Sequence, residues 1–295
     1  MAFSGVATNR TNIELPADLS AEILQKTQEQ SAIMRLARQI TLPGRGVEIP
    51  VITSDPTAEW VSETGTKPVS NPGLSKKVMS AYKLAVIVPF SNEFRRDAAA
   101  LYDQLVARLP LALAKQFDQT VVGGQAPGSN FTTLASCEAQ ELTTGAYEAL
   151  VSADGDIADN GGMLNGFALS PQAKSVLLAD TDDNGRPLFI NSVAEGAIPM
   201  ILGAPTVMSK GIYVPGVSAD IVGVAGDWTQ AVYGTVEGVR IDYSSDATLV
   251  TGESGDESFI NLFQQNMFAV RAEIEVGFVA DADCFNLLTK ADASA

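Results

Sequence analysis

Residues 48–94 read EIPVITSDPTAEWVSETGTKPVSNPGLSKKVMSAYKLAVIVPFSNEF, and from Arg95 the chain continues as RRDAAALYDQLVARLPLALAKQFDQTVVGG. The first stretch has few large apolar residues between Thr64 and Val78, and up to Asn92 it carries four lysines and no acidic residue. Such an extended ribbon cannot build a core of its own. A loop of this length inside a compact domain is uncommon unless it is functional or lies on another surface. We therefore expect the ribbon to lie on a neighbouring copy of the chain.

The second stretch has the periodicity of a long amphipathic helix. A large apolar residue recurs at every fourth position, which places one broad apolar stripe on the helix surface. These residues are Leu101, Leu105, Leu109, Leu113 and Phe117. Pro110 lies inside this stripe. Because proline removes one helical hydrogen bond and bends the axis, we predict a kink near residues 106–110 without a loss of burial.

Shorter elements flank these two stretches. Before the ribbon, Asp18 or Ser20 is suited to cap a helix that ends before Pro43. After Gly124 the pattern mixes helix and strand, which predicts an α+β domain. The expected helices are 144–153 and 171–179, and the expected strands are 166–170, 199–208, 220–225, 230–235, 239–243, 247–250 and 263–279. We expect the last of these strands to pair beside the long helix.

Composition excludes several classes of function. The 295 residues are 46% hydrophobic, which is enough for a sizeable core in two domains, and they include no histidine. Without histidine the chain cannot build a Ser-His-Asp or Cys-His nucleophile pair, nor a zinc site that needs imidazole. Cys137 and Cys284 form no CxxC motif, and we interpret them as buried thiols of a protein made in a reducing cytosol. Neither a signal-peptide pattern nor an apolar run of about 18 residues is present, so we expect no membrane partner.

Charge is unevenly distributed along the chain. The formal net charge is −16, yet residues 1–120 hold 13 basic and 12 acidic side chains, whereas the remaining residues hold 6 and 23. Nucleic-acid binding depends on Lys and Arg side chains that displace counterions from phosphates, so this balance argues against a protein that grips DNA. The acidic half is either a surface on which the lysines of the ribbon dock or a solvated surface that keeps the protein soluble.

Several short segments, in this order, resemble one protein family. They are Ala58–Glu63, Ser91–Phe94 with Asp97, Asn165–Pro171, Asp183–Leu188, Leu202–Val207, Gly226–Trp228, Phe259 to Asn266, Arg271–Glu273 and Gly277–Val279. In order and spacing they are similar to the major capsid proteins of tailed bacteriophages. The resemblance implies the phage major capsid fold: an α+β subunit with an N-terminal arm, an extended intersubunit loop, a long spine helix in a peripheral domain, and a central (axial) α+β domain.

The resemblance also implies a division of the chain and a function. We expect an arm with a short helix at 1–42, the intersubunit loop at 43–90, the peripheral domain with its spine helix at 91–130, the axial domain at 131–245, and returning peripheral strands at 246–295. The implied function is a major capsid protein that self-assembles as hexamers and pentamers into an icosahedral shell around phage double-stranded DNA. The alternatives are an encapsulin-like nanocompartment shell and, from a different class, a histidine-free hydrolase that acts through carboxylates.

The resemblance implies partners and a location as well. The partners are copies of the chain itself, a portal and a possible decoration protein, in a virion assembled in the cytoplasm of the host bacterium. Family members with an internal scaffold have a long N-terminal extension, whereas about forty residues precede the ribbon here. We therefore expect an unprocessed N-terminus and either a separately encoded scaffolding protein or none. DNA is enclosed without sequence-specific binding, and no cofactor or metal is expected.

The ribbon supplies the candidate contact residues. We expect a neighbouring subunit to contact Trp60, Lys67, Lys76, Lys77 and Lys83. Some family members join a loop lysine to an asparagine of a neighbour through an isopeptide bond, with a buried glutamate as proton acceptor. Asn266 and Glu273 resemble that asparagine and glutamate, and Lys67, Lys76 and Lys77 are the candidate nucleophiles. Because only a deprotonated lysine attacks, burial beside the glutamate has to lower its pKa. Asparagine at this place also occurs in relatives that form no bond.

Two further patterns are weaker candidates for chemistry. Asp180, Asp182, Asn184 and Gly185 match positions one, three, five and six of a calcium loop, but position twelve is Asn191 instead of a glutamate. We interpret this segment as a turn. Glu273 and Glu275 lie two apart on a predicted strand and share a face, a spacing that suits acid–base work only if one carboxylate is buried.

Overall fold

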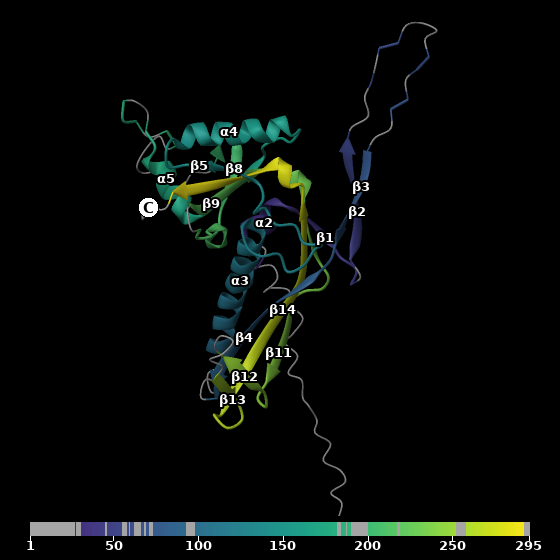
Figure 1. Cartoon of the computed structure of the whole chain (residues 1–295). Coiled ribbons are helices and arrows are strands. Elements are labelled where there is room, and N and C mark those ends of the chain that lie inside the picture. Colours follow the sequence, from purple (N-terminus) through teal and green to yellow (C-terminus); the bar gives the residue numbers. More distant parts are fainter. Residues whose placement is uncertain are drawn as a thin grey trace, which may run out of the picture.

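The computed structural model describes residues 27, 31–44, 46–54, 58, 60–61, 66–67, 69–70, 73–92, 98–181, 184–186, 188–189, 200–216, 219–251 and 258–291. Within these ranges a sheet with two helices forms one body, a long helix beside a long sheet forms a second, and a hairpin projects to the side (Figure 1). Helices and strands occur in both bodies, so the predicted α+β fold class is confirmed. Among the described helices, none is both long and apolar enough to cross a bilayer.

The long helix predicted from the sequence forms the spine of the second body. Helix α3 runs Ala98–Val122 and continues through Pro110 without a break in its assignment. Leu109, Leu113 and Phe117 are buried, so this part of the apolar stripe packs inward as predicted. The side chains of Leu101 and Leu105 lie outside the described residues. The kink at Pro110 stays a prediction.

Five described strands form a sheet beside α3, which we call the spine sheet. It is built on β14 (Met267–Ala280). One edge of β14 pairs antiparallel with β4 (Tyr82–Ser91). The other edge pairs with β11 (Arg240–Ser244) and β10 (Ala231–Thr235), and β1 (Arg38–Thr41) joins β10 in parallel. Side chains of a strand alternate between its two faces. Alternate residues of β14 therefore pack with the spine helix in one core; they are Phe268, Val270, Ala272 and Ile274.

The first body is a sheet of six described strands covered by helices, and we call this sheet the axial sheet. Its strand order is β5 (Glu138–Glu141), β15 (Phe285–Ala291), β9 (Ala219–Gly226), β6 (Gly166–Leu169), β8 (Ala204–Met208) and β7 (Met200–Ile201). Helices α4 (Ala146–Asp159) and α5 (Pro171–Ala179) pack their apolar sides into a core with β6 and β9. The Ser170 hydroxyl caps α5 by accepting a hydrogen bond from the Ala173 N–H, and Pro171 suits the first helical position.

The ribbon forms a two-stranded hairpin that projects from the rest of the molecule (Figure 1). Strands β2 (Val47–Ser54) and β3 (Gly73–Met79) pair with each other and, within the described residues, with no other strand. A small cluster holds the base of the hairpin, where buried Met79 packs with Leu42, Val232 and Val279. Residues 82–90, at the end of the segment that we expected to be loop, form β4 of the spine sheet.

The arm holds a short helix followed by a strand. Helix α2 covers Ala32–Leu36 and is capped by the Ser31 hydroxyl, which accepts a hydrogen bond from the Met34 N–H. It ends before Pro43, as predicted. Ala37 is extended, and the next four residues form β1 because they pair with β10. The predicted caps Asp18 and Ser20 lie outside the described residues.

Three strands lie in a sheet other than the one that we expected. We placed β10 and β11 with the central domain, but both pair with β14 in the spine sheet. We placed β15 with the returning peripheral strands, but it pairs with β5 and β9 in the axial sheet. The reason is the length of β14, whose 14 residues span roughly 45 Å and offer one edge to both β10 and β11. The limits of the five predicted segments stay a prediction.

A small hairpin lies at the far end of the spine body (Figure 1). Strands β12 (Thr248–Thr251) and β13 (Ser258–Asn261) pair with each other as a separate two-stranded sheet. We expected one strand over residues 263–279, but β14 begins at Met267. The chain turns just before it, and Asn266 has a positive φ of 53°.

Candidate functional site

Three of the four ribbon lysines bind acidic side chains of their own chain. The Lys76 Nζ lies 2.7 Å from a Glu48 carboxylate oxygen across the hairpin. The Lys77 Nζ lies 3.2 Å from a carboxylate oxygen of Asp281 and donates to the backbone oxygen of Ala280. The Lys83 Nζ lies 3.4 Å from Glu275 on the neighbouring strand β14. Lys76 thus pairs within the hairpin, Lys77 links the hairpin to the end of β14, and Lys83 pairs across β4 and β14.

The fourth lysine and the tryptophan of the ribbon behave differently. Lys67 is exposed and forms no ion pair with any residue that the structure describes. Trp60 is fully exposed, with a relative accessibility of 105%. Transfer of a large aromatic side chain from water into a packed interface lowers the free energy. An exposed tryptophan in a free subunit therefore favours burial against another surface. Trp60 and Lys67 are thus the two predicted contact residues that are exposed without an ion pair to any described residue, and contact of the five with a neighbour stays a prediction.

The candidate isopeptide residues lie along β14. Asn266 stands at its beginning, and its side-chain oxygen accepts a hydrogen bond of 2.8 Å from the Asn92 amide, which fixes the orientation of the Asn266 carbonyl. Glu273 is seven residues further on, with its carboxylate 3.2 Å from Arg271 and its side chain 19% exposed. Seven residues of extended strand span roughly 23 Å. The structure therefore does not bring Asn266, Glu273 and the lysines together within one chain.

Charged side chains cover the face of the spine sheet that points away from α3. Arg271 donates to the Asp242 carboxylate at 2.6 Å and also lies beside Glu273, while Arg240 lies 3.4 Å from Asp242. The hydrogen bond from Arg271 holds the pKa of Asp242 below its usual value. Glu273 and Glu275 share this face as predicted, but both face cations, so they form no acid–base pair.

A buried carboxylate joins three elements near the end of the spine helix. Asp118 of α3 accepts hydrogen bonds from the Ser31 hydroxyl at 2.5 Å, from the Ala32 N–H at 3.1 Å and from the Ser209 hydroxyl at 2.8 Å. Ser209 caps the short 3₁₀ helix η2 (Lys210–Ile212). Burial raises the pKa of Asp118 to about 6, against the lowering effect of these hydrogen bonds. Asp118 was not among the predicted residues.

The described residues of the candidate calcium loop have structural roles that involve no metal ion. The Asp180 carboxylate accepts a hydrogen bond of 3.1 Å from the Tyr147 N–H and so satisfies the first turn of α4. Asn184 and Gly185 lie in a turn, and Gly185 has a positive φ of 75°. Asp182 and Asn191 lie outside the described residues. Within the described part of the chain, no group of three Cys, Asp or Glu side chains could hold a metal ion.

Both cysteines are free thiols, as far as the described residues show. Cys284 is buried, and burial raises the pKa of its thiol. Cys137 is half-buried, and burial raises the pKa of its thiol to about 12. A thiol with a raised pKa is a poor nucleophile and a poor metal ligand, so neither cysteine is a candidate for catalysis.

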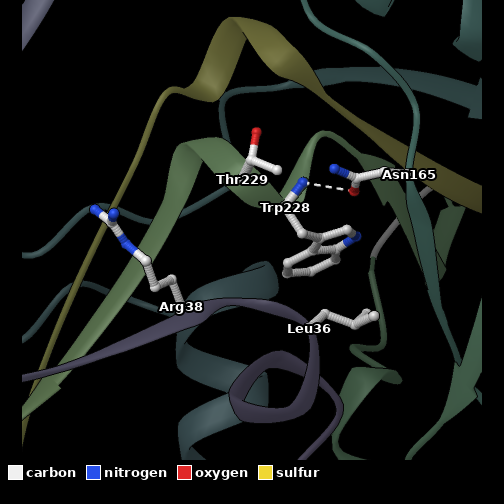
Figure 2. Close-up of a pocket in the computed structure, with 5 residues that line it drawn as sticks. All are labelled: Leu36, Arg38, Asn165, Trp228 and Thr229. Atoms are coloured by element: carbon white, nitrogen blue, oxygen red, sulfur yellow. Dashed lines mark hydrogen bonds between the residues drawn. The ribbon is translucent and has the colours of Figure 1, made fainter.

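A polar network missed by the sequence analysis lies where the arm meets the axial sheet. The Asp227 carboxylate accepts hydrogen bonds from the Asn165 amide and the Thr229 hydroxyl, and Asn165 accepts one from the Trp228 N–H. An open pocket of about 360 Å³ lies beside this network. Figure 2 shows residues that line it, with Leu36 below the Trp228 ring and Arg38 apart from that ring. Asn165 and Asp227–Trp228 had been noted only as part of the family resemblance.

The projecting hairpin, the long helix with its sheet and the six-stranded sheet are the parts that the resemblance to a known family predicted. Over residues 12–288 the chain matches the phage capsid family, and it belongs to that family. It is therefore a capsid shell protein of the virion, within a family of structural proteins. The predicted phage major capsid fold is confirmed.

Relatives agree along nearly the whole chain. The probable major capsid protein gp17 of Mycobacterium phage L5 is 29% identical over 300 residues, covering 95% of this chain and 90% of that protein. The major capsid protein of Staphylococcus phage 80alpha is 24% identical and covers 93% of this chain and 84% of that protein. A solved structure from Gordonia phage Cozz has a TM-score of 0.69 at 21% identity, over 89% of this chain and 87% of that chain. That likeness shows a shared fold.

Proposed function

We propose that the chain self-assembles as hexamers and pentamers into an icosahedral shell that encloses phage double-stranded DNA. Assembly takes place in the cytoplasm of the host bacterium, with a separately encoded scaffolding protein and a portal. Family membership supports a self-assembling shell protein without catalytic turnover. Two ion pairs argue against the alternative of a carboxylate hydrolase. Glu273 pairs with Arg271 and Glu275 pairs with Lys83, so neither carboxylate serves as the acid or base of such a site.

The observation that carries the proposal is the β2–β3 hairpin. Its base is anchored in a buried cluster, but beyond that base it makes no described pairing outside itself. A two-stranded hairpin alone in water is marginally stable at best. A neighbouring subunit that covers the hairpin would supply the missing packing, which is what a shell of contacting copies provides.

The acidic surface supports enclosure of DNA without binding to it. Exposed acidic side chains gather on β5 and α4; they are Glu138, Glu141, Glu148, Asp154 and Asp159. Such a surface offers few cations to replace the counterions of a duplex. We expect the isolated subunit to bind duplex DNA no better than a generic acidic protein at physiological salt. Micromolar, steeply salt-dependent binding in a gel-shift assay would contradict this part of the proposal.

A covalent cross-link between copies is a separate part of the proposal. A neutral lysine amine would attack the side-chain carbonyl carbon of Asn266. Glu273 would accept the proton that the attacking nitrogen loses and return it to the amide nitrogen of Asn266, so that the C–N bond of the side-chain amide breaks, ammonia leaves and the new amide bond remains. Lys67 is the preferred nucleophile because Lys76 and Lys77 have partners in their own chain. Asn266 and Glu273 would come from different copies, given their separation along β14.

Denaturing electrophoresis of boiled particles tests the cross-link. A ladder of multimers that disappears in Asn266→Asp and in Glu273→Gln would support it. A single monomer band from wild-type particles would remove the cross-link from the proposal and leave the shell untouched.

Electron microscopy of the purified full chain tests the shell itself. We expect closed particles with fivefold and sixfold clusters of subunits, and particles from infected cells should contain DNA. Shells filled with a protein cargo would indicate the encapsulin-like alternative. A dispersed small protein under every assembly condition would overturn the proposal.

A further inference from the structure

Two glycines face each other across neighbouring strands of the spine sheet. Gly234 of β10 and Gly277 of β14 are partners in the antiparallel register. The next pair on the same face, Val232 and Val279, belongs to the buried cluster at the hairpin base. Glycine weakens the interior of a strand and often marks the close approach of another part of the chain. A facing pair of glycines leaves a hollow in this face of the sheet.

The base of the β2–β3 hairpin fills this hollow. A Cβ atom added to Gly234 would overlap the Leu42 side chain, whose Cδ1 would be 2.7 Å away, and it would lie 3.0 Å from the Met79 sulfur. A Cβ atom added to Gly277 would lie 2.6 Å from the backbone oxygen of Ser80 and 2.9 Å from the Met79 Cγ. Leu42 and Met79 are both buried. We call Gly234 and Gly277 the glycine socket.

The main chain itself passes over the sheet at Gly277. Ser80 lies between β3 and β4, where the hairpin ends and the spine sheet begins. The loop after the spine helix holds the same point of the chain. The Asn130 side-chain amide donates to the Ser80 hydroxyl at 3.1 Å, and the Asn130 N–H donates to the Tyr82 hydroxyl at 3.2 Å. The backbone at Ser80 is thus held by both the sheet and this loop.

The start of the hairpin converges on the same point. Gly46 directly precedes β2 and has a φ of 82°, a conformation that glycine adopts without strain. A Cβ atom at Gly46 would lie 2.6 Å from the Met79 backbone oxygen. Both strands of the hairpin therefore meet at Met79. The hairpin cannot tilt about its base without moving the Met79 and Ser80 backbone relative to the socket.

We infer that the glycine socket sets the direction in which the hairpin leaves the subunit. A side chain at either position would lift Met79 and Ser80 off the sheet, because a close-packed interior has no room for the added methyl group. A small displacement at the base becomes a larger one along the hairpin. A tilted hairpin would then meet a neighbouring copy out of register. Gly234 and Gly277 are positioning residues of assembly, a role that rests on the proposed function.

The distance between two spin labels tests the socket on dissociated subunits of the full chain. One label is attached at Val69→Cys, in the segment before β3, and the other at Met163→Cys, which precedes β6 of the axial sheet. Both positions are exposed, at 88% and 76%. Cys137 and Cys284 are changed to alanine in every variant, so that only the introduced thiols carry labels.

Added methyl groups at the socket should change this distance. Gly277→Ala and Gly234→Ala should each shift the mean label distance by more than the width of the wild-type distribution. Gly155→Ala is the matched control and should leave the distance unchanged, since a Cβ atom there meets no other atom within 4 Å. Circular dichroism checks that each variant is folded. Unchanged distances in both socket variants would overturn the inference.

Compensation at Leu42 separates a positioning effect from a general loss of stability. Leu42→Ala removes the side chain that the new methyl group of Gly234→Ala would overlap, so the double variant should recover at least half of the shift in distance. The same Leu42→Ala change should not rescue Gly277→Ala, because the closest clash there is with the Ser80 backbone oxygen. If Gly277→Ala does not fold, the Gly234 and Leu42 variants decide alone. A double variant shifted as far as Gly234→Ala would overturn the socket.

Assembly of the same variants tests the positioning role. Gly234→Ala should raise the subunit concentration needed for shells roughly tenfold or more, the effect of a cost of the size that overpacking imposes. Leu42→Ala added to it should lower that concentration again. Shifted label distances with normal assembly would overturn the positioning role. If wild-type chains form no shells, the proposed function fails, whereas the label distances still decide whether the socket directs the hairpin.

Discussion

At the scale of single residues, Asp118 is the most constrained group that the structure describes. It is fully buried and receives hydrogen bonds from two capping serines and one backbone N–H. These bonds tie α2 and η2 to the spine helix. A buried carboxylate that is not paired with a cation costs folding free energy when it is charged.

Asp118 should make stability depend on pH. Burial raises its pKa in the folded protein to about 6, above the ordinary value of 3.8. The folded state therefore holds the proton more tightly, and the resulting stabilisation is complete below about pH 4 and is lost as the pH rises through about 6. The full effect is on the order of 3 kcal/mol. Thermal unfolding at pH 5 and pH 7.5 should show a smaller pH dependence for Asp118→Asn than for the wild type. Parallel profiles of the two proteins would contradict this assignment.

Residue roles were only partly predictable from the sequence. The sequence marked the four ribbon lysines as one set. Only the structure separates Lys67 from the other three, because the acidic partners of Lys76, Lys77 and Lys83 lie far away in the chain. These partners are Glu48, Asp281 and Glu275. Asp118 follows Phe117 in a helix whose burial pattern gives no sign that a carboxylate is buried there. Its partners Ser31 and Ser209 are 87 and 91 positions away. Contacts at such separations leave no local signal.

At the scale of elements, local capping residues predicted the limits of a helix well, whereas the pairing of distant strands could not be predicted from the sequence. Helix α5 was predicted with the limits that the structure shows, because Ser170 and Pro171 define its start. Strand β1 was not predicted, because Arg38–Thr41 become a strand only through pairing with β10. The assignment of β10 and β15 to sheets failed for the same reason.

Lys77 should limit the motion of the hairpin relative to the body. It links β3 to Asp281 and to the Ala280 carbonyl, whereas Lys76 pairs with Glu48 inside the hairpin. Both pairs are substantially exposed, so each contributes about 0 to 1 kcal/mol to stability. We expect Lys77→Ala to increase proteolysis or hydrogen exchange at the hairpin base with little change in melting temperature. Lys76→Ala is the matched control. Equal effects of the two substitutions would show that Lys77 does not act as the link.

Met79 should be the main packing anchor of the hairpin. It is fully buried beside Leu42 in the cluster at the hairpin base. Met79→Ala should lower the free energy of unfolding by about 2 to 5 kcal/mol, as large-to-small changes in cores do. Met163→Ala, at an exposed position, should change it by less than about 0.5 kcal/mol. Denaturant unfolding measures both, and a loss below about 1 kcal/mol for Met79→Ala would mean that the base is not a packed core.

At the scale of the whole molecule, the order of the family-like segments in the sequence predicted the fold class. The predicted function depended on the ribbon, which does not pack against its own subunit beyond the base of the hairpin. The sequence predicted a ribbon without a core, and the structure shows a hairpin anchored only at its base. Which apolar side chains the fold leaves exposed could not be predicted from the sequence, since exposure depends on what the fold covers.

The most direct test of this account is hydrogen exchange at the β2–β3 hairpin, measured on dissociated subunits and on assembled particles of the full chain. We predict rapid exchange of the hairpin amides beyond the base in the dissociated subunit and strong protection in the particle, with little change in the axial sheet. Equal exchange of the hairpin in both states, or a stable monomer whose hairpin is already protected, would contradict the claim that neighbouring copies cover it.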